Sequence, residues 1–273
     1  MSHITNNSVI LTNNEFKNIK QIIYTKCGIN ITIEQKNLLE HKLRKRLKHC
    51  TLDCFTQYYN RLNSDPKELQ EMINVVTTNE TYFFREMKHF DFLKNTIIPN
   101  LKTNSIRCWS AAGSIGAEAY SAAMVLDDTL PSFKDYEIIH SDINSEVSKD
   151  AQKAIYNIKF SSKIPQSYLE KYCLKGYDEN NGLFSISQKL KDNITFLLIN
   201  LIEPVPPHKL GEFDIIFLRN IIIYFDDENK KRIVENTIQR LKQGGYLFMG
   251  HSESLHHITN NVKQIQPSIY QKI

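Results

Sequence analysis

Several apolar runs of this sequence end in polar or charged residues, and these are the positions whose types could do chemistry. The small-residue segment Ser110–Ala117 runs into Glu118, and His140-Ser141 at the end of the next apolar run precedes Asp142. Small residues let a ligand approach the backbone where a helix begins. An acid after the next strand is where nucleotide-binding α/β folds hydrogen-bond a ribose. The pattern therefore favours a ribose-containing ligand.

These residues also have structural explanations. Packing between a strand and the following helix accounts for small residues almost as well as a ligand does. Glu118 could complement the dipole of a helix start. Asp142 could cap the next helix, although Asn144 or Ser145 could do so instead. We favour ribose binding for Asp142 and leave Glu118 open between ligand and dipole.

Two more apolar runs end in Asn200-Leu201 and in Arg219-Asn220, and the second is followed by Ile221–Ile223 and Tyr224. Ligands of open α/β sheets bind at the carboxyl ends of the strands, so these are candidate site residues. They could instead satisfy the hydrogen-bonding groups at the strand ends.

The segment at 77–86, TTNETYFFRE, places three aromatic residues directly before Arg85. Arg85 could form a structural ion pair with its stem packed on the rings. It could also bring a positive charge to a carboxylate in a cleft between two domains.

Most of these residues fall after residue 100, where short apolar runs alternate with helical patterns. The runs are Ile106–Ser110, Glu137–Ser141, Ile194–Leu201, Phe213–Leu218 and Tyr246–Gly250, and the helical patterns lie at 116–128, 145–156 and 227–242. Apolar strands separated by helices predict a parallel sheet covered on both faces. Residues 160–192 break the alternation, and Asn181-Gly182 before Leu183–Ile186 predicts a small antiparallel insertion. Ser268–Lys272 is predicted as an antiparallel edge strand.

The first 77 residues carry four apolar stripes at helical spacing, which predict a helical N-terminal domain. This part holds eleven Lys/Arg and seven Asp/Glu, so it carries the whole net charge of +4 and the other 196 residues sum to zero. The excess peaks between Lys36 and Lys48, a stretch that contains Arg44, Lys45 and Arg46. This cluster could be a solvated helix face or could attract an acidic surface.

Cysteines and apolar runs indicate the compartment. The five cysteines are scattered, which predicts reduced thiols. His49-Cys50 with Cys54 lacks a second group of ligands, so we expect no metal site. No apolar run is long enough to cross a bilayer, and the N-terminus lacks a signal-peptide pattern. We therefore expect a cytoplasmic protein without membrane insertion.

These segments together resemble the CheR-type chemotaxis receptor methyltransferases along the whole chain. The matching strings are TTNETYFFRE at 77–86, CWSAAGSIGAEAYS at 108–121, SDI at 141–143, NL at 200–201, FDIIFLRNIIIYF at 213–225 and GGYLFMGHSE at 244–253. The resemblance implies an α/β, Rossmann-like S-adenosylmethionine-dependent methyltransferase domain with an all-α N-terminal domain and a small antiparallel β insertion. The implied boundaries are 1–77 for the helical domain with its basic substrate-docking face, 78–100 for an interdomain linker, 101–273 for the methyltransferase domain and 160–192 for the insertion.

The resemblance also implies roles for individual residues. Cofactor contacts carry over onto Asn79, Thr81, Arg85, Glu118, Asp142, Asn200, Leu201, Arg219 and Asn220. Arg85 and Tyr224 are implied to lie near the transferred methyl group and to act in catalysis. Where the family usually has Thr-Gly-Glu-Glu-Pro-Tyr, this chain has IGAEAY at 115–120. The acid implied to touch the cofactor is kept as Glu118, and the departure bears on loop rigidity and cofactor affinity.

The implied reaction moves a methyl group from S-adenosylmethionine to glutamate carboxylates of a methyl-accepting chemotaxis receptor's cytoplasmic domain, leaving S-adenosylhomocysteine. The residues implied to dock this acidic receptor region are Arg44, Lys45, Arg46 and Lys48. The β insertion could bind a peptide at the receptor C-terminus. We expect a monomer, and no nucleic-acid partner because the last 196 residues are neutral. Two alternatives stay open: a cofactor-binding regulatory or scaffold module, and a methyltransferase acting on a different carboxylate substrate.

Overall fold

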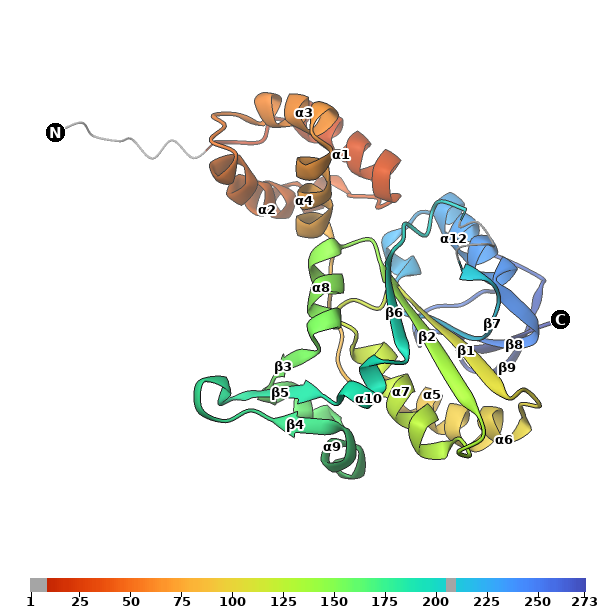
Figure 1. Cartoon of the computed structure of the whole chain (residues 1–273). Helices are drawn as coiled ribbons and strands as arrows, with labels where there is room; N and C mark the ends of the chain where they lie inside the picture. Colours follow the sequence, from red (N-terminus) through yellow and green to blue (C-terminus); the bar gives the residue numbers. More distant parts are fainter. Residues whose placement is uncertain (1–8, 205–209) are drawn as a thin grey trace. The chain divides into compact units, whose positions relative to one another are not determined.

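The computed structural model describes residues 9–204 and 210–273, and the contacts within the chain group into two compact units that divide between Thr78 and Asn79. The N-terminal unit is helical, and the C-terminal unit combines two β-sheets with helices (Figure 1). No helix within the described residues combines the length and the apolar character that a membrane span requires.

Four α-helices build the described part of the N-terminal unit, residues 9–78, as the apolar stripes predicted. They are α1 (Asn13–Cys27), α2 (Lys36–His49), α3 (Phe55–Ser64) and α4 (Pro66–Val76), with the 3-10 turn η1 (Ile33–Gln35) before α2. Thr12 and Glu15 form a capping box that starts α1, and Gly28 at φ 73° ends it. Asp65 caps the start of α4. Local sequence therefore sets where these helices begin and end.

A buried carboxylate ties three of these helices together. Glu68 on α4 is 4% exposed and accepts hydrogen bonds from Arg46 of α2 at 2.9 and 2.6 Å. Tyr58 of α3 donates to it at 2.8 Å and the Cys50 thiol at 3.2 Å. Burial alone would raise the pKa of Glu68, but these donors outweigh burial and hold the pKa below its ordinary value. Glu68 is thus an ionised buried group whose paired cation is Arg46.

A seven-stranded sheet in the order β6-β2-β1-β7-β8-β10-β9 forms the centre of the C-terminal unit. Its strands are β1 (Ser105–Ala111), β2 (Asp135–Asp142), β6 (Ile194–Leu198), β7 (Phe213–Leu218), β8 (Leu241–Met249), β9 (Val262–Gln266) and β10 (Ile269–Lys272). The first five strands of the order are parallel, and β10 is antiparallel to both neighbours. The chain moves outward from β1 to β2 and β6 on one side and to β7 and β8 on the other. This switch point is where open sheets of this kind bind ligands.

Helices cover both faces of this sheet, as Figure 1 shows for α7 and α12. The helical segments around the sheet are α5 (Met87–Phe92), the π-helical turn η2 (Leu93–Ile97), α6 (Ile98–Asn100), α7 (Ala117–Thr129), α8 (Ser145–Lys153), α10 (Gln188–Lys191) and α12 (Asp227–Gln239). All residues of β7 are buried, and its last four residues alternate between two cores. Ile215 and Phe217 pack in the core that contains α7, whereas Ile216 and Leu218 pack in the core that contains α12. The prediction of a sheet covered on both faces is confirmed.

The predicted small antiparallel sheet is also confirmed, but it begins with β3 at Ile155, before the predicted bound of 160. Its three strands, in the order β3-β5-β4, are β3 (Ile155–Asn157), β5 (Leu183–Ile186) and β4 (Cys173–Lys175). Between them lie the 3-10 turns η3 (Ile158–Lys163) and η4 (Asp178–Asn180) and the helix α9 (Gln166–Tyr172). Gly182, at φ 83°, makes the turn into β5.

Several predictions about the elements were wrong. The helix predicted over 227–242 ends at Gln239, because β8 begins at Leu241 rather than at Tyr246. The strand predicted over Ile194–Leu201 ends at Leu198. The strand at the C-terminus is antiparallel, but β9 rather than β10 lies at the sheet edge. The helix predicted over 145–156 ends at Lys153. Ala154 adopts a left-handed conformation at φ 54°, and Ile155 begins β3. The apolar residues that completed the helical pattern therefore belong to a strand.

Candidate active site

Asp142 is the last residue of β2, at the carboxyl edge of the sheet, and its side chain hydrogen-bonds to the loop that follows β1. β1 and β2 run parallel with Ala111 opposite Ser141, so their carboxyl ends share this edge. Asp142 accepts the Ser114 amide on Oδ2 at 2.9 Å and the Asn144 amide on Oδ1 at 2.8 Å. Asn144 is the residue that caps α8, so Asp142 does not serve as the cap of that helix. Burial raises the pKa of Asp142, and the backbone amides oppose that rise.

The loop after β1 is pressed against β2. The Gly113 amide donates to the Ser141 carbonyl at 2.9 Å. A Cβ at Gly113 would lie 2.5 Å from His140 Nδ1 and 2.6 Å from Ser110 Oγ. Gly116 turns the chain into α7 at φ 85°. Close packing of the loop therefore requires glycine at position 113, as the packing explanation of the small residues proposed.

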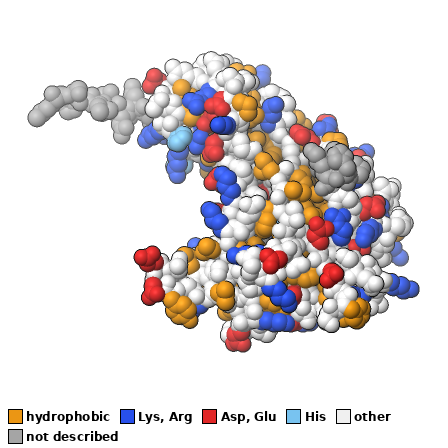
Figure 2. All heavy atoms as spheres, viewed as in Figure 1, with side chains coloured by type: hydrophobic (Ala, Val, Ile, Leu, Met, Phe, Trp, Pro, Cys, Tyr) orange, Lys and Arg blue, Asp and Glu red, His pale blue; other side chains and the backbone are white. Residues whose placement is uncertain are grey.

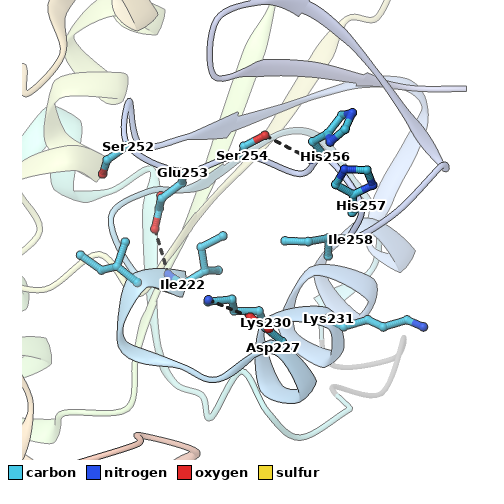
Figure 3. Close-up of a pocket in the computed structure, with 11 residues that line it drawn as sticks. Ile222, Asp227, Lys230, Lys231, Ser252, Glu253, Ser254, His256, His257 and Ile258 are labelled. Carbon is cyan, nitrogen blue, oxygen red and sulfur yellow. Dashed lines mark hydrogen bonds and ion pairs between the residues drawn. The ribbon is translucent and has the colours of Figure 1, made fainter. Parts of the chain in front are cut away.

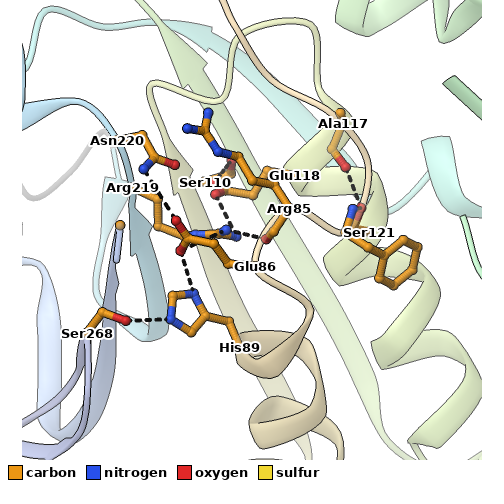
Figure 4. A network of polar contacts seen from close by, with 12 residues as sticks. Arg85, Glu86, His89, Ser110, Ala117, Glu118, Ser121, Arg219, Asn220 and Ser268 are labelled. Carbon is orange, nitrogen blue, oxygen red and sulfur yellow. Dashed lines mark hydrogen bonds and ion pairs between the residues drawn. The ribbon is translucent and has the colours of Figure 1, made fainter. Parts of the chain in front are cut away.

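A chain of charged groups joins the ends of β1 and β7 to the segment before α5 (Figure 4). Glu118 accepts the Ser110 hydroxyl at 2.6 Å and lies 3.4 Å from Arg219 Nη1. Arg219, whose side chain is 2% exposed, places Nη2 3.2 Å from Glu86 Oε2 and donates to the Arg85 carbonyl. One guanidinium thus bridges two carboxylates and holds the backbone next to Arg85.

The two carboxylates respond differently to this guanidinium. Burial raises the pKa of Glu118, with Arg219 and the Ser110 hydroxyl opposing the rise. Burial also acts on Glu86, but Arg219 and the His251 amide outweigh it, so the pKa of Glu86 falls below its ordinary value. Glu86 is therefore the firmly ionised partner of Arg219.

Two histidines lie beside Glu86. His89 is 1% exposed, with Nε2 2.8 Å from Ser268 Oγ and Nδ1 3.4 Å from Glu86 Oε2. Burial, reinforced by Arg219, lowers the pKa of His89 to about 3, so its ring is neutral at neutral pH. Within residues 9–204 and 210–273, one group of potential metal ligands was found, Glu86, His89 and His251, with ligand atoms within 4.8 Å of one another. The neighbouring Arg219 charge opposes a cation at this place.

The segment that carries Arg85 is fixed through its backbone. The Phe84 amide donates to Ser121 Oγ of α7 at 2.9 Å, and the Asn79 carbonyl accepts the Ser114 hydroxyl at 3.2 Å. Arg85 itself is half-buried, and its Nη1 donates to the Glu80 carbonyl at 2.9 Å. Its guanidinium points away from the Arg219–Glu86 pair (Figure 4). Thr81, also half-buried, lies on the same segment.

Asn220 and Tyr224 follow the end of β7. Asn220 has φ 56°, its amide donates to Glu253 Oε2 at 2.7 Å, and its Nδ2 lies 3.4 Å from Glu86 Oε1. The 3-10 turn η5 (Ile222–Tyr224) comes next and ends in the half-buried Tyr224. The chain thus turns sharply between the network and the candidate tyrosine.

Asn200 and Leu201 follow β6 at the same edge. β6 pairs with β2 so that Leu198 lies opposite Asp142, and the Ile199 amide donates to the Asp142 carbonyl at 3.0 Å. The side chain of Asn200 donates to Glu203 at 3.2 Å, and Leu201 is buried.

Hydrogen bonds and ion pairs through Arg219 and Glu86 link Arg85, Glu118, Arg219 and Asn220 in one group. Hydrogen bonds through Ser114 link Asp142 to Asn79. The sequence indicated no role for three residues that lie around the first group: Glu86, His89 and Glu253. Glu86 ends the TTNETYFFRE string and Glu253 ends GGYLFMGHSE, so the strings pointed to them without indicating what they contact.

The basic residues of α2 differ in what they are free to contact. Arg44 pairs with Glu40 and donates to the Val9 carbonyl at 3.1 Å. Arg46 is committed to Glu68. Lys45 and Lys48 are exposed. Lys, Arg and His side chains gather on the surface of this helical unit (Figure 2).

Comparison with known proteins gives matches in both units. Two family models match: the CheR methyltransferase all-alpha domain over residues 14–77 and the CheR methyltransferase SAM binding domain over 79–270. Chemotaxis protein methyltransferase 2 of Pseudomonas aeruginosa is 33% identical over 95% of this chain and 93% of its own. The chemotaxis protein methyltransferase of Borreliella burgdorferi is 34% identical over 98% and 97%, and that of Escherichia coli K12 35% over 91% and 87%.

Proposed function

The chain belongs to the CheR methyltransferase family, and from this premise we propose that it methylates glutamate side chains in the cytoplasmic domain of a chemotaxis receptor. Family membership makes the chain a methyltransferase that uses S-adenosylmethionine and acts in chemotaxis. The observation that carries the proposal is the match of the SAM binding domain over 79–270, because that stretch contains every residue proposed to touch the cofactor.

The polar groups at the sheet edge fit the chemistry of this cofactor. The Asp142 carboxylate accepts the backbone amides of Ser114, Asn144 and Ile143, and a carboxylate has about four acceptor sites, so it can still accept a ribose hydroxyl. The amino-acid end of the cofactor carries an ammonium and a carboxylate, which suit Glu118 and Arg219 respectively. Arg219 Nε is buried without a hydrogen-bond partner, so this guanidinium can still donate to a ligand. The remaining proposed contacts are Asn79, Thr81, Arg85, Asn200, Leu201 and Asn220.

The substrate side of the reaction makes modest demands. The bound cofactor would supply a methyl group activated by its own sulfonium. A glutamate carboxylate has an ordinary pKa of about 4.3, so it is ionised at neutral pH and needs no general base. We assign Arg85 to orienting that carboxylate and the Tyr224 hydroxyl to holding the reacting groups in line. Tight pairing with Arg85 would stabilise the nucleophile's ground state, so the contact is an orienting one.

Receptor docking is proposed for the basic face of α2. The receptor region would be acidic and helical. Lys45 and Lys48 are exposed and are the residues we assign to first contact. Arg44 and Arg46 already have partners within their own unit, so their part in docking would require those pairs to open.

The small sheet is the proposed place for a receptor C-terminal peptide. β4 lies at one edge of the β3-β5-β4 sheet, and an extended peptide could add to it as a further strand. Leu174 of β4 and the following Tyr177 are exposed apolar side chains that could contact such a peptide. Fluorescence anisotropy with labelled receptor-tail peptides tests this, and absence of saturable binding would reject it.

The test of the main proposal uses labelled cofactor and receptor cytoplasmic fragments. We expect base-labile label on receptor glutamates. Arg85→Ala should lower transfer by at least about 100-fold through lost orientation, while the exposed neighbour in Lys88→Ala should transfer normally. If the wild type binds the cofactor but transfers no label, the result would instead support a binding module. Label on a different acid would support a methyltransferase with a different carboxylate substrate. Near-normal turnover by Arg85→Ala would reject the role of Arg85.

A further inference from the structure

Glu253 is a buried carboxylate to which the reaction scheme gives no task. Its side chain lies in the loop after β8 and is 6% exposed. Oε2 accepts the Asn220 and Gly250 amides, each at 2.7 Å, and Oε1 accepts the Ile222 amide at 2.9 Å. Figure 3 shows this carboxylate directed at Ile222, at one wall of a cavity of about 520 Å³. Both oxygens are therefore used by backbone amides alone.

Two of those amides belong to the sharp turn between β7 and η5. Asn220 occupies the left-handed region at φ 56°, which a non-glycine residue adopts at a cost that its surroundings must offset. Hydrogen bonds to an ionised acceptor are shorter and stronger than neutral ones. Burial raises the pKa of Glu253, and the backbone amides that it accepts oppose this rise by favouring the ionised form. Because Glu253 accepts amides on either side of Ile221, it fixes the direction in which the chain leaves β7.

The third amide brings the loop after β8 onto the same turn. A Cβ on Gly250 would lie 2.3 Å from Asn220 Nδ2 and 2.7 Å from Glu253 Oε2. No larger residue fits without movement of one or the other. The two loops therefore pack as one body with the carboxylate at its centre.

We infer that Glu253 is a positioning residue for methyl transfer, acting through the turn that carries Asn220 towards the cofactor and Tyr224 towards the reacting methyl group. The inference rests on the proposed roles of Asn220 and Tyr224. Loss of the carboxylate would leave three amides without their acceptor and let the turn relax, which misplaces both side chains without touching substrate.

The experiment compares Glu253→Gln with Ser252→Ala, a change at the exposed preceding residue of the same loop. Glutamine keeps the shape but places an amide donor against backbone donors. We expect Glu253→Gln to lower kcat at least about 10-fold and to weaken S-adenosylhomocysteine binding about 5-fold by calorimetry, with Ser252→Ala unchanged. Glu253→Asp, which keeps the charge on a shorter stem, should recover part of both losses. Hydrogen exchange should accelerate in the peptide spanning 219–225.

A double-mutant cycle separates positioning from general damage. If Glu253 acts through Tyr224, Glu253→Gln should lower kcat far less in a Tyr224→Phe background, because residues that act as a unit are non-additive. Full multiplication of the two losses, or wild-type kinetics of Glu253→Gln, would overturn the inference. Equal acceleration of hydrogen exchange throughout the C-terminal unit of Glu253→Gln would also overturn the inference. Wild-type behaviour of Asn220→Ala and Tyr224→Phe alone would instead refute the proposed site.

Discussion

Reversing the charge of Lys45 and Lys48 tests receptor docking without disturbing the fold. Both side chains are exposed on α2. Arg46 lies between them in sequence, but it pairs with the buried Glu68 at 2.6 Å. Changing Arg46 to Glu would leave Glu68 unpaired and set a second negative charge beside it, at a cost of about 3–5 kcal/mol. A loss of activity in that variant would report unfolding as readily as lost docking.

The expected size of the lysine effect follows from exposure. Exposed ion pairs contribute about 0.2–1 kcal/mol each, and reversal replaces an attraction by a repulsion of similar size. Two reversals should therefore cost about 2 kcal/mol at low salt, which is about 30-fold in apparent affinity for the receptor. Screening should shrink the effect to a few-fold at about 500 mM salt.

The assay is the initial rate of methyl transfer over a range of receptor-fragment concentrations, at about 50 mM and about 500 mM salt. Lys45→Glu/Lys48→Glu should raise KM for the fragment at low salt, with little change in kcat and in affinity for S-adenosylhomocysteine. A matched control, Lys17→Glu/Lys26→Glu, makes the same net charge change at exposed positions of α1. An unchanged KM, or an equal rise in the control, would refute local docking on α2.

Three further predictions concern affinity and stability. Asp142→Asn should weaken S-adenosylhomocysteine binding at least about 10-fold by calorimetry, because an amide oxygen cannot replace both acceptors; unchanged affinity would contradict its role. Glu68→Gln should destabilise the N-terminal unit by about 3 kcal/mol at neutral pH. Since the folded pKa of Glu68 is lowered, the carboxylate's contribution is present above the ordinary value of 4.5 and is lost as the pH falls through the folded pKa. As the pH falls, the free energies of unfolding of the wild type and Glu68→Gln should therefore converge. A difference between them that stays constant with pH would contradict the role of the Glu68 carboxylate. Gly113→Ala, which forces a Cβ against His140, should lower the melting temperature by the equivalent of about 1–3 kcal/mol; an unchanged melt would show that the loop can move.

Sequence patterns predicted those elements whose burial is regular. Phe213–Leu218 was predicted with the bounds that β7 has, because five of its six residues are apolar, as expected of a strand covered on both faces. Its one charged residue, Asp214, is buried and accepts hydrogen bonds from the Arg107 amide and Lys242. Leu183–Ile186 was predicted likewise, since its side chains alternate between buried and half-buried positions. In both cases burial sets the type of most residues in the element.

Elements without a regular buried face gave no such signal. β9, Val262–Gln266, is exposed at four of its five positions, so no apolar period marks it and Ser268–Lys272 was taken for the edge. β3 and β4 are three residues each, too short for a period to develop. These strands are defined by their neighbours in the sheet, which a local pattern does not contain.

The site likewise contains residues that the sequence marked and contacts that it did not. Polar residues at strand ends mark where a ligand could sit, and the sequence indicated Asp142 and Arg219 on that ground. Arg219 pairs with Glu86 and binds the Arg85 carbonyl, which lies 134 residues away in the sequence. Only the fold brings these residues together, so their pairing leaves no local pattern. Which basic residue of α2 would be buried against Glu68 was equally invisible, because α2 and α4 meet only in the fold.

Arg219 and Arg85 have different partners, and this difference explains how one site could bind both the cofactor carboxylate and the receptor carboxylate. Arg219 is 2% exposed and lies between Glu86 and Glu118, so its charge is largely balanced within the protein. The Arg85 guanidinium donates to a neutral carbonyl, that of Glu80, and points away from the Arg219–Glu86 pair, while its charge acts on Glu118. An incoming carboxylate is therefore attracted to Arg85 more than to Arg219, because balanced charges contribute little net field at the site. If Arg219 were instead the receptor's contact, Arg219→Lys would change KM for the receptor more than affinity for S-adenosylhomocysteine; we expect the reverse.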